Sequence, residues 1–132
     1  MSIKRYVSAS IAVFVFIFLY EWVFHGILLK PVYNATQHLW RAQEDCVFWA
    51  MLLGQFLFPF IFAYIFTKGY EKKGIAEGIR FGVVIGLLFV PSNLIYYAVQ
   101  PLPGSLVLAW CFGGIIEMAI AGAILAAVYK NS

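Results

Sequence analysis

Long apolar runs separated by short polar connections make up most of the chain. Four such runs cover about residues 6–29, 46–67, 78–98 and 105–128. A helix needs roughly 20 apolar residues to cross the hydrocarbon core of a bilayer, and each run is about that long. The pattern predicts an all-α, polytopic integral membrane protein: a single domain over residues 1–132, folded as a bundle of four transmembrane helices.

The longest connection, residues 30–45, carries a helical pattern of its own. Pro31 can open a helix, and Val32, Thr36 and Leu39 then fall on one stripe. A short helix of this kind suits the surface of a membrane. We therefore expect a short interfacial helix in the first outer loop, followed by Asp45 as the N-cap of the second span.

Composition supports the same class. Hydrophobic residues make up 64% of the chain and charged residues 11%, whereas soluble domains have roughly 45–50% and 25%. Four spans and their connections use the whole length, which leaves no soluble module. Cys46 and Cys111 fall at different expected depths, so we expect no disulfide between them.

The placement of the basic residues predicts an orientation. The side that both termini share receives six of them: Lys4, Arg5, Lys68, Lys72, Lys73 and Lys130. The opposite side receives Lys30 and Arg41. Because basic residues in short loops favour the cytoplasmic face, we expect both termini in the cytoplasm. The expected location is an inner or plasma membrane, in the first place the inner membrane of a bacterium.

Small residues predict where helices approach one another. Glycine recurs at every fourth position into the third span, at Gly74, Gly78, Gly82 and Gly86, which places a smooth groove along one helix face. Gly114 and Gly122 are small positions of the fourth span. We expect these glycines to mediate helix packing, either between the third and fourth spans or with another subunit.

Five polar side chains interrupt the apolar runs between the expected midplane and the outer surface: Glu21, His25, Gln55, Asn93 and Glu117. Glu117 lies near the middle of its span, where inserting an acid costs roughly 3 kcal/mol. It is therefore expected to be protonated, hydrogen-bonded to a neighbouring helix, or facing a wet cavity. Glu21 and His25 are four residues apart and share a helix face. We expect a polar intramembrane cluster, which serves either as a structural network or as a proton-handling site.

Other chemistries have less support. The cluster offers a single histidine and no thiolate at its depth, so we expect no metal and no other cofactor. A haem would need His25 together with Met118 or with a ligand from another subunit. No serine, histidine and acid stand in a recognisable catalytic context, so we expect no catalytic residues.

Two functions of different class are compatible with the sequence. The first is a small non-enzymatic membrane protein that acts by helix packing, as a homo-oligomer or as a structural accessory subunit of a larger membrane complex. The alternative is a small dimeric proton-coupled transporter or channel that uses Glu117 and Glu21. Neither involves nucleic acid, because the basic residues lie at the ends of spans rather than in one patch.

Overall fold

The computed structural model describes residues 2–131, and all of its regular structure in that range is helical. Four helices are long and apolar enough to cross a membrane. They are α1 (Ile3–Val23, continued by a π-helical turn at Phe24–Leu28), α3 (Phe48–Lys68), α4 (Ile75–Val99) and α5 (Gly104–Asn131). This confirms the predicted all-α class and the number of long apolar helices.

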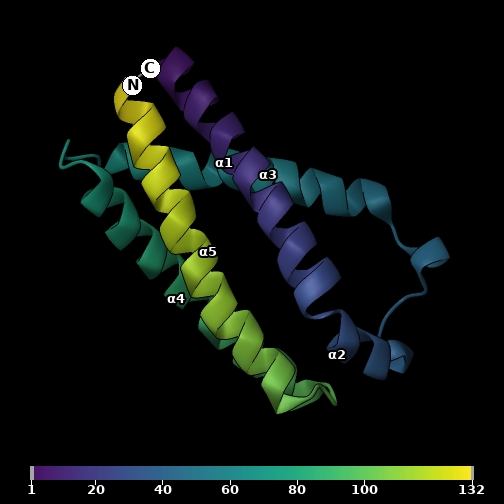
Figure 1. The fold of residues 1–132 in the computed structure, drawn as a ribbon. Coiled ribbons are helices and arrows are strands. Elements are labelled where there is room, and N and C mark those ends of the chain that lie inside the picture. Colours follow the sequence, from purple (N-terminus) through teal and green to yellow (C-terminus); the bar gives the residue numbers. More distant parts are fainter. Residues whose placement is uncertain (1, 132) are drawn as a thin grey trace.

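The helix α5 is the centre of the bundle. It runs between α4 and α1 and packs along both, most extensively along α4 (Figure 1). Both termini lie at one end of the bundle, which we call the terminal end. The opposite end carries α2 (Lys30–Ala35), and we call it the α2 end. The remaining long helix, α3, crosses the others at a large angle, so its first half projects away from them.

The connection between α1 and α3 is built from short helical pieces. Pro31 stands in the first turn of α2, as expected, and two single turns of 3-10 helix follow at Gln37–Leu39 and Gln43–Asp45. The prediction that Asp45 caps the next helix is wrong. It ends the second 3-10 turn, and the N-cap position of α3 is Val47, which makes no side-chain cap hydrogen bond.

The apolar core lies toward the terminal end. Its members come from α1, α3 and α5: Ala9, Val13, Ile17, Phe62, Ala63, Phe66, Met118, Ala121, Leu125, Ala126 and Tyr129. The ring of Phe81 on α4 lies against this core, with its centroid 4.9 Å from that of Phe62. All four long helices therefore meet in one core at this end.

The glycines of α4 are the points where α4 and α5 come closest. A Cβ atom added at Gly78 would collide with the carbonyl oxygen of Gly122, and one at Gly82 with that of Met118. At Gly86 the same atom would lie 2.7 Å from Cα of Ile115. Backbones can approach this closely only where no side chain intervenes. The groove predicted on the third span is therefore filled by α5 of the same chain.

Two of the predicted packing glycines, Gly74 and Gly114, differ from the others in what surrounds them. Gly74 precedes α4 with φ +81°, a left-handed conformation that L side chains rarely adopt, so it serves the turn rather than the helix contact. A Cβ atom at Gly114 would meet nothing within 4 Å among the described residues. Gly114 lines a cavity on that side, while its carbonyl oxygen lies against α4, 3.3 Å from the place of a Cβ atom at Gly86.

Candidate functional site

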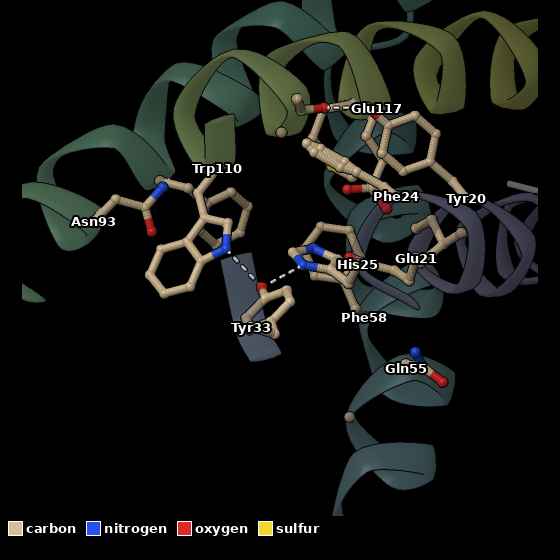
Figure 2. A pocket seen from close by; sticks show the side chains of 16 residues that line it. Tyr20, Glu21, Phe24, His25, Tyr33, Gln55, Phe58, Asn93, Trp110 and Glu117 are labelled. Atoms are coloured by element: carbon tan, nitrogen blue, oxygen red, sulfur yellow. Dashed lines mark hydrogen bonds and ion pairs between the residues drawn. The ribbon is translucent and has the colours of Figure 1, made fainter. Parts of the chain in front are cut away.

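A cavity of about 410 Å³ opens among the helices. Every long helix lines it, and α2 adds one side chain (Figure 2). Its lining residues are Ile17, Tyr20, Glu21, Phe24, His25, Tyr33, Gly54, Gln55, Phe58, Phe89, Asn93, Trp110, Gly113, Gly114, Glu117 and Met118. The volume lies in the range of small-molecule sites, which are roughly 300–1,000 Å³.

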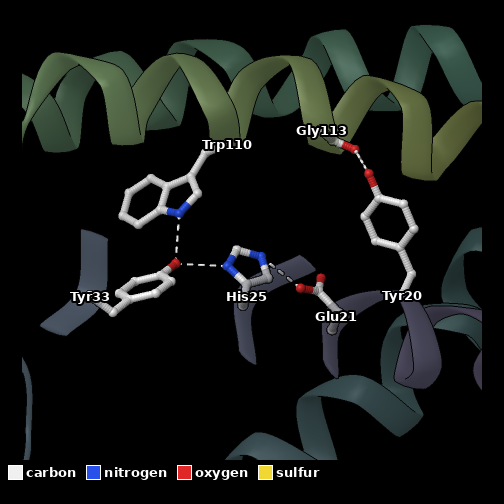
Figure 3. A network of polar contacts seen from close by, with 6 residues as sticks. All are labelled: Tyr20, Glu21, His25, Tyr33, Trp110 and Gly113. Atoms are coloured by element: carbon white, nitrogen blue, oxygen red, sulfur yellow. Dashed lines mark hydrogen bonds and ion pairs between the residues drawn. The ribbon is translucent and has the colours of Figure 1, made fainter. Parts of the chain in front are cut away.

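Four side chains form a chain of polar contacts along one wall (Figure 3). Oε2 of Glu21 lies 2.8 Å from Nε2 of His25, one helical turn further along α1. Nδ1 of His25 lies 2.7 Å from the hydroxyl of Tyr33, and Nε1 of Trp110 donates to the same hydroxyl at 2.8 Å. The chain thus links α1, α2 and α5.

When the imidazole of His25 is neutral, the hydrogen-bonding capacities of these groups determine which atom donates in each contact. The indole N–H of Trp110 can only donate, so the Tyr33 oxygen accepts from it and turns its own hydrogen toward Nδ1 of His25. Nε2 then carries the imidazole hydrogen and donates to Glu21. Burial raises the pKa of the Tyr33 hydroxyl above its ordinary value, with the Trp110 hydrogen bond opposing the change, so the hydroxyl keeps its proton at neutral pH.

The most deeply buried acid of the cavity wall is Glu117, which is 5% exposed. Within residues 2–131, its Oε2 atom is buried and has no hydrogen-bond partner. Its carboxyl group is close enough to that of Glu21 for the two to interact electrostatically. Two acids from the neighbouring helices α1 and α5 therefore meet in the wall of this cavity.

Tyr20 fixes the wall next to these acids. Its hydroxyl donates to the carbonyl oxygen of Gly113 on α5 at 2.7 Å (Figure 3). The ring of Phe24 stacks on that of Tyr20, with 5.5 Å between centroids. It also occupies the space that a Cβ atom at Gly113 would need. The absence of a side chain at position 113 thus allows α1 and α5 to hold Glu21 and Glu117 close together.

The five polar residues singled out in the sequence all line this one cavity. They are not one network, however. Asn93 donates through Nδ2 to the sulfur of Cys111 at 3.8 Å, on the side of the cavity near Trp110. Gln55 stands on α3, well apart from the other labelled polar groups in Figure 2. Its buried Oε1 atom likewise lacks a hydrogen-bond partner in the part of the chain that the structure describes.

Sequence reasoning missed Tyr33 and Trp110 as members of the site. Tyr33 lies on the short connecting helix, and its contact with His25 depends on how α2 folds back toward α1. The signal that could have pointed to it is aromatic content: α2 and the turns after it carry rings at Tyr33 and Trp40, 5.4 Å apart, and Trp40 in turn contacts Trp110.

Comparisons with protein-family models, with curated proteins and with solved structures found no match to this chain.

Proposed function

We propose that this chain is a small integral membrane protein that moves protons, as a proton-coupled transporter or channel acting through Glu117 and Glu21. The membrane location is supported by the outward faces of the four long helices, which carry exposed large apolar side chains along their length. Such a continuous apolar surface is typical of helices in contact with lipid. The distribution of basic residues supports a cytoplasmic terminal end. The α2 end and its short helix then lie at the outer interface.

The observation that carries the proposal is the unpaired carboxyl oxygen of Glu117 in a cavity wall. A buried acid that served only to hold helices together would have both oxygens hydrogen-bonded, because an unmatched buried group costs roughly 1–3 kcal/mol. Glu117 instead has the carboxyl group of Glu21 beside it in the cavity wall. Two carboxylates this close in a low dielectric repel one another strongly, so the pair holds at least one proton. That proton is the species to be moved.

A path for the proton leads from this pair toward the α2 end. When Nδ1 of His25 accepts a proton from the Tyr33 hydroxyl, Nε2 can release one to Glu21. Water at the interface then restores the Tyr33 proton. Each step breaks one bond to hydrogen and forms another over a contact of 2.7–2.8 Å, which is within reach for direct transfer.

The packing hypothesis was motivated by the glycine groove, by the small residues of the fourth span and by the chain length that four spans use up. The groove no longer favours a second subunit, because α5 of the same chain occupies it. A role in assembly remains within the proposal, since four helices rarely enclose a complete pathway. We expect a homodimer, with the cavities of two copies contributing to the route.

The test is proton flux without any added ligand. The protein is reconstituted into vesicles of phosphatidylethanolamine and phosphatidylglycerol that enclose a pH-sensitive dye, with valinomycin and equal potassium on both sides to compensate charge. We expect the wild-type protein to collapse an imposed pH gradient at least tenfold faster than protein-free vesicles do. Glu117→Gln should return the rate to that of empty vesicles, because an amide cannot exchange a proton in this way.

The control variant is Glu71→Gln, which alters an exposed acid in the loop at the terminal end, paired with Lys73 at 3.3 Å. It should leave the flux unchanged. A Glu117→Gln rate equal to that of the wild type, or a wild-type rate no faster than empty vesicles, would refute the proposal.

A further inference from the structure

The cavity wall presents hydrogen-bond acceptors that the protein itself does not use. Oε2 of Glu117 and Oε1 of Gln55 are both buried, and among residues 2–131 no N–H or hydroxyl group donates a hydrogen bond to either of them. Glu117 is more than nine-tenths buried and comes from α5, whereas Gln55 comes from α3. A ligand that completes this site must therefore bring its own hydrogen-bond donors. A positive charge on the ligand would also balance an ionised Glu117.

Much of the remaining wall is aromatic. It includes the rings of Tyr20, Phe24, Phe58, Phe89 and Trp110. Aromatic faces attract organic cations and bury apolar bodies, whereas they cannot replace the hydration shell of a small inorganic ion. The lining therefore favours a ligand whose donors sit on a cationic nitrogen and whose remaining part is apolar.

One side of the cavity is open toward the surroundings of the bundle. The ring contacts that join α3 to α4 begin at Phe58, which meets Phe89 at 5.8 Å, and continue inward to Phe62 and Phe81. On the side of α1, Phe56 still contacts Phe14 at 5.7 Å. Large side chains in the first half of α3 are 44–71% exposed: Phe48, Trp49, Met51, Leu52, Leu53, Phe56 and Leu57. The cavity can therefore be reached between the first half of α3 and α4.

We propose that the cavity binds a lipophilic ammonium ion, an amphiphile with N–H donors on its charged nitrogen, which reaches the site from the outer leaflet between α3 and α4. The assignment rests on the proposed function, because the proton on Glu117 is the one the ligand replaces. Binding of R–NH₃⁺ to the protonated acid releases that proton to water and leaves an ammonium–carboxylate pair, so charge balances. The ammonium nitrogen pairs with Glu117, and the aromatic wall holds the apolar body.

Binding is tested with three probes that share one aromatic body: 2-naphthylmethylamine, its trimethylammonium analogue and 2-naphthylmethanol. Affinity for the purified protein in mild detergent is measured by titration calorimetry at neutral pH. We expect the amine to bind at least tenfold more tightly than the alcohol. The quaternary analogue, which has charge but no donor, should bind with intermediate affinity. In Glu117→Gln the amine should fall to the affinity of the alcohol, while Glu71→Gln should match the wild type.

Two results would overturn the ligand assignment: equal affinities of amine and alcohol for the wild type, or an undiminished affinity of the amine for Glu117→Gln. The assay is separate from the ligand-free proton flux. Flux with no preference for the amine would refute the ligand alone, and amine binding without flux would refute the proposed function alone.

The access route has its own matched pair of variants. Gly54 and Gly69 lie near opposite ends of α3, and a Cβ atom at either would meet nothing within 4 Å among the described residues. Gly54→Phe should fill the opening and slow association of the amine with the protein in vesicles at least fivefold, measured by stopped-flow fluorescence. Gly69→Phe should leave the rate unchanged. Equal rates for the two variants would overturn access between α3 and α4.

Discussion

Two buried acids, one near the terminal end and one near the middle of the bundle, have very different surroundings. Glu77, near the terminal end, is 8% exposed, and its two carboxyl oxygens accept from the backbone N–H groups of Glu71 and Lys73 at 2.7 and 2.9 Å. Glu117 is buried to a similar degree, but its Oε2 has no donor within the described residues. Glu77 therefore holds the loop before α4 in place. Oε2 of Glu117, in contrast, is available to accept a hydrogen bond from a ligand. Burial alone does not distinguish these roles; hydrogen-bond satisfaction does.

Helix packing also differs between the terminal end and the α2 end of the bundle. Toward the terminal end, Gly78 and Gly122 bring the backbones of α4 and α5 together, and the apolar core fills the space beside them. Toward the α2 end, Gly114 faces the cavity and α3 projects away. The bundle is therefore tightly packed toward the terminal end and open where the polar groups lie.

The largest expected effect comes from filling the tight contact between α4 and α5. Gly82→Ala places a methyl group against the carbonyl oxygen of Met118, and backbone on both sides cannot move aside easily. We expect it to destabilise the protein by about 3 kcal/mol or more, at the upper end of overpacking effects. Thermal unfolding in detergent measures this.

Gly114→Ala is the matched change at the other end, because its Cβ atom meets open space within the described structure. Its stability should stay the same or rise by up to about 1 kcal/mol, since alanine favours helix more than glycine does. Similar losses for the two variants would remove the contrast between the tight and the open end.

A second comparison replaces each buried acid by leucine. Glu77→Leu leaves two backbone N–H groups without their acceptor and should destabilise the protein by about 3 kcal/mol. Glu117→Leu removes an unmatched buried polar atom and should raise stability by about 1 kcal/mol while abolishing proton flux. Unfolding in detergent and flux in vesicles are measured for both. A loss of stability in Glu117→Leu as large as in Glu77→Leu would mean that Glu117 is a structural strut.

The smallest effect concerns two tyrosine hydroxyls. Tyr6 donates to the carbonyl oxygen of Phe60 at 2.6 Å near the core, and Tyr33 joins His25 to Trp110 in the polar chain. Each change to phenylalanine should cost about 1 kcal/mol in stability. Only Tyr33→Phe should slow proton flux, because it alone interrupts the path to Glu21. Equal fluxes in the two variants would exclude the route through Tyr33.

Much of the fold follows from local pattern. The four apolar runs predict the four long helices, since backbone groups in an apolar segment must satisfy one another within the helix. The glycines at 78, 82 and 86 predict a close helix contact, because spacing by four places them on one face. The sequence alone could not decide between an internal partner and a second subunit, and the contacts of Gly78 with Gly122 identify α5.

The residues that line the site could be predicted from the sequence more completely than the hydrogen bonds between them. Depth along each run grouped Glu21 with Glu117, but which atoms lack a partner depends on helix rotation and on the projection of α3, and neither is encoded in residue spacing. The contribution of Tyr33 requires the short helix α2 to fold back toward α1. The hydrogen bonding of Glu77 depends on the turn before α4, where Lys72 and Gly74 adopt positive φ. Tertiary packing determines these contacts, and residue spacing does not predict them.

The central claim is that Glu117 carries a proton that can be exchanged, and infrared spectroscopy of its carboxyl group tests this most directly. Wild-type protein in vesicles at neutral pH should show a protonated-carboxyl band that Glu117→Gln removes. The band should shift within minutes in D₂O and disappear when 2-naphthylmethylamine binds. A wild-type spectrum with no band lost in Glu117→Gln, or a Glu117 band that neither D₂O nor the amine changes, would contradict the claim.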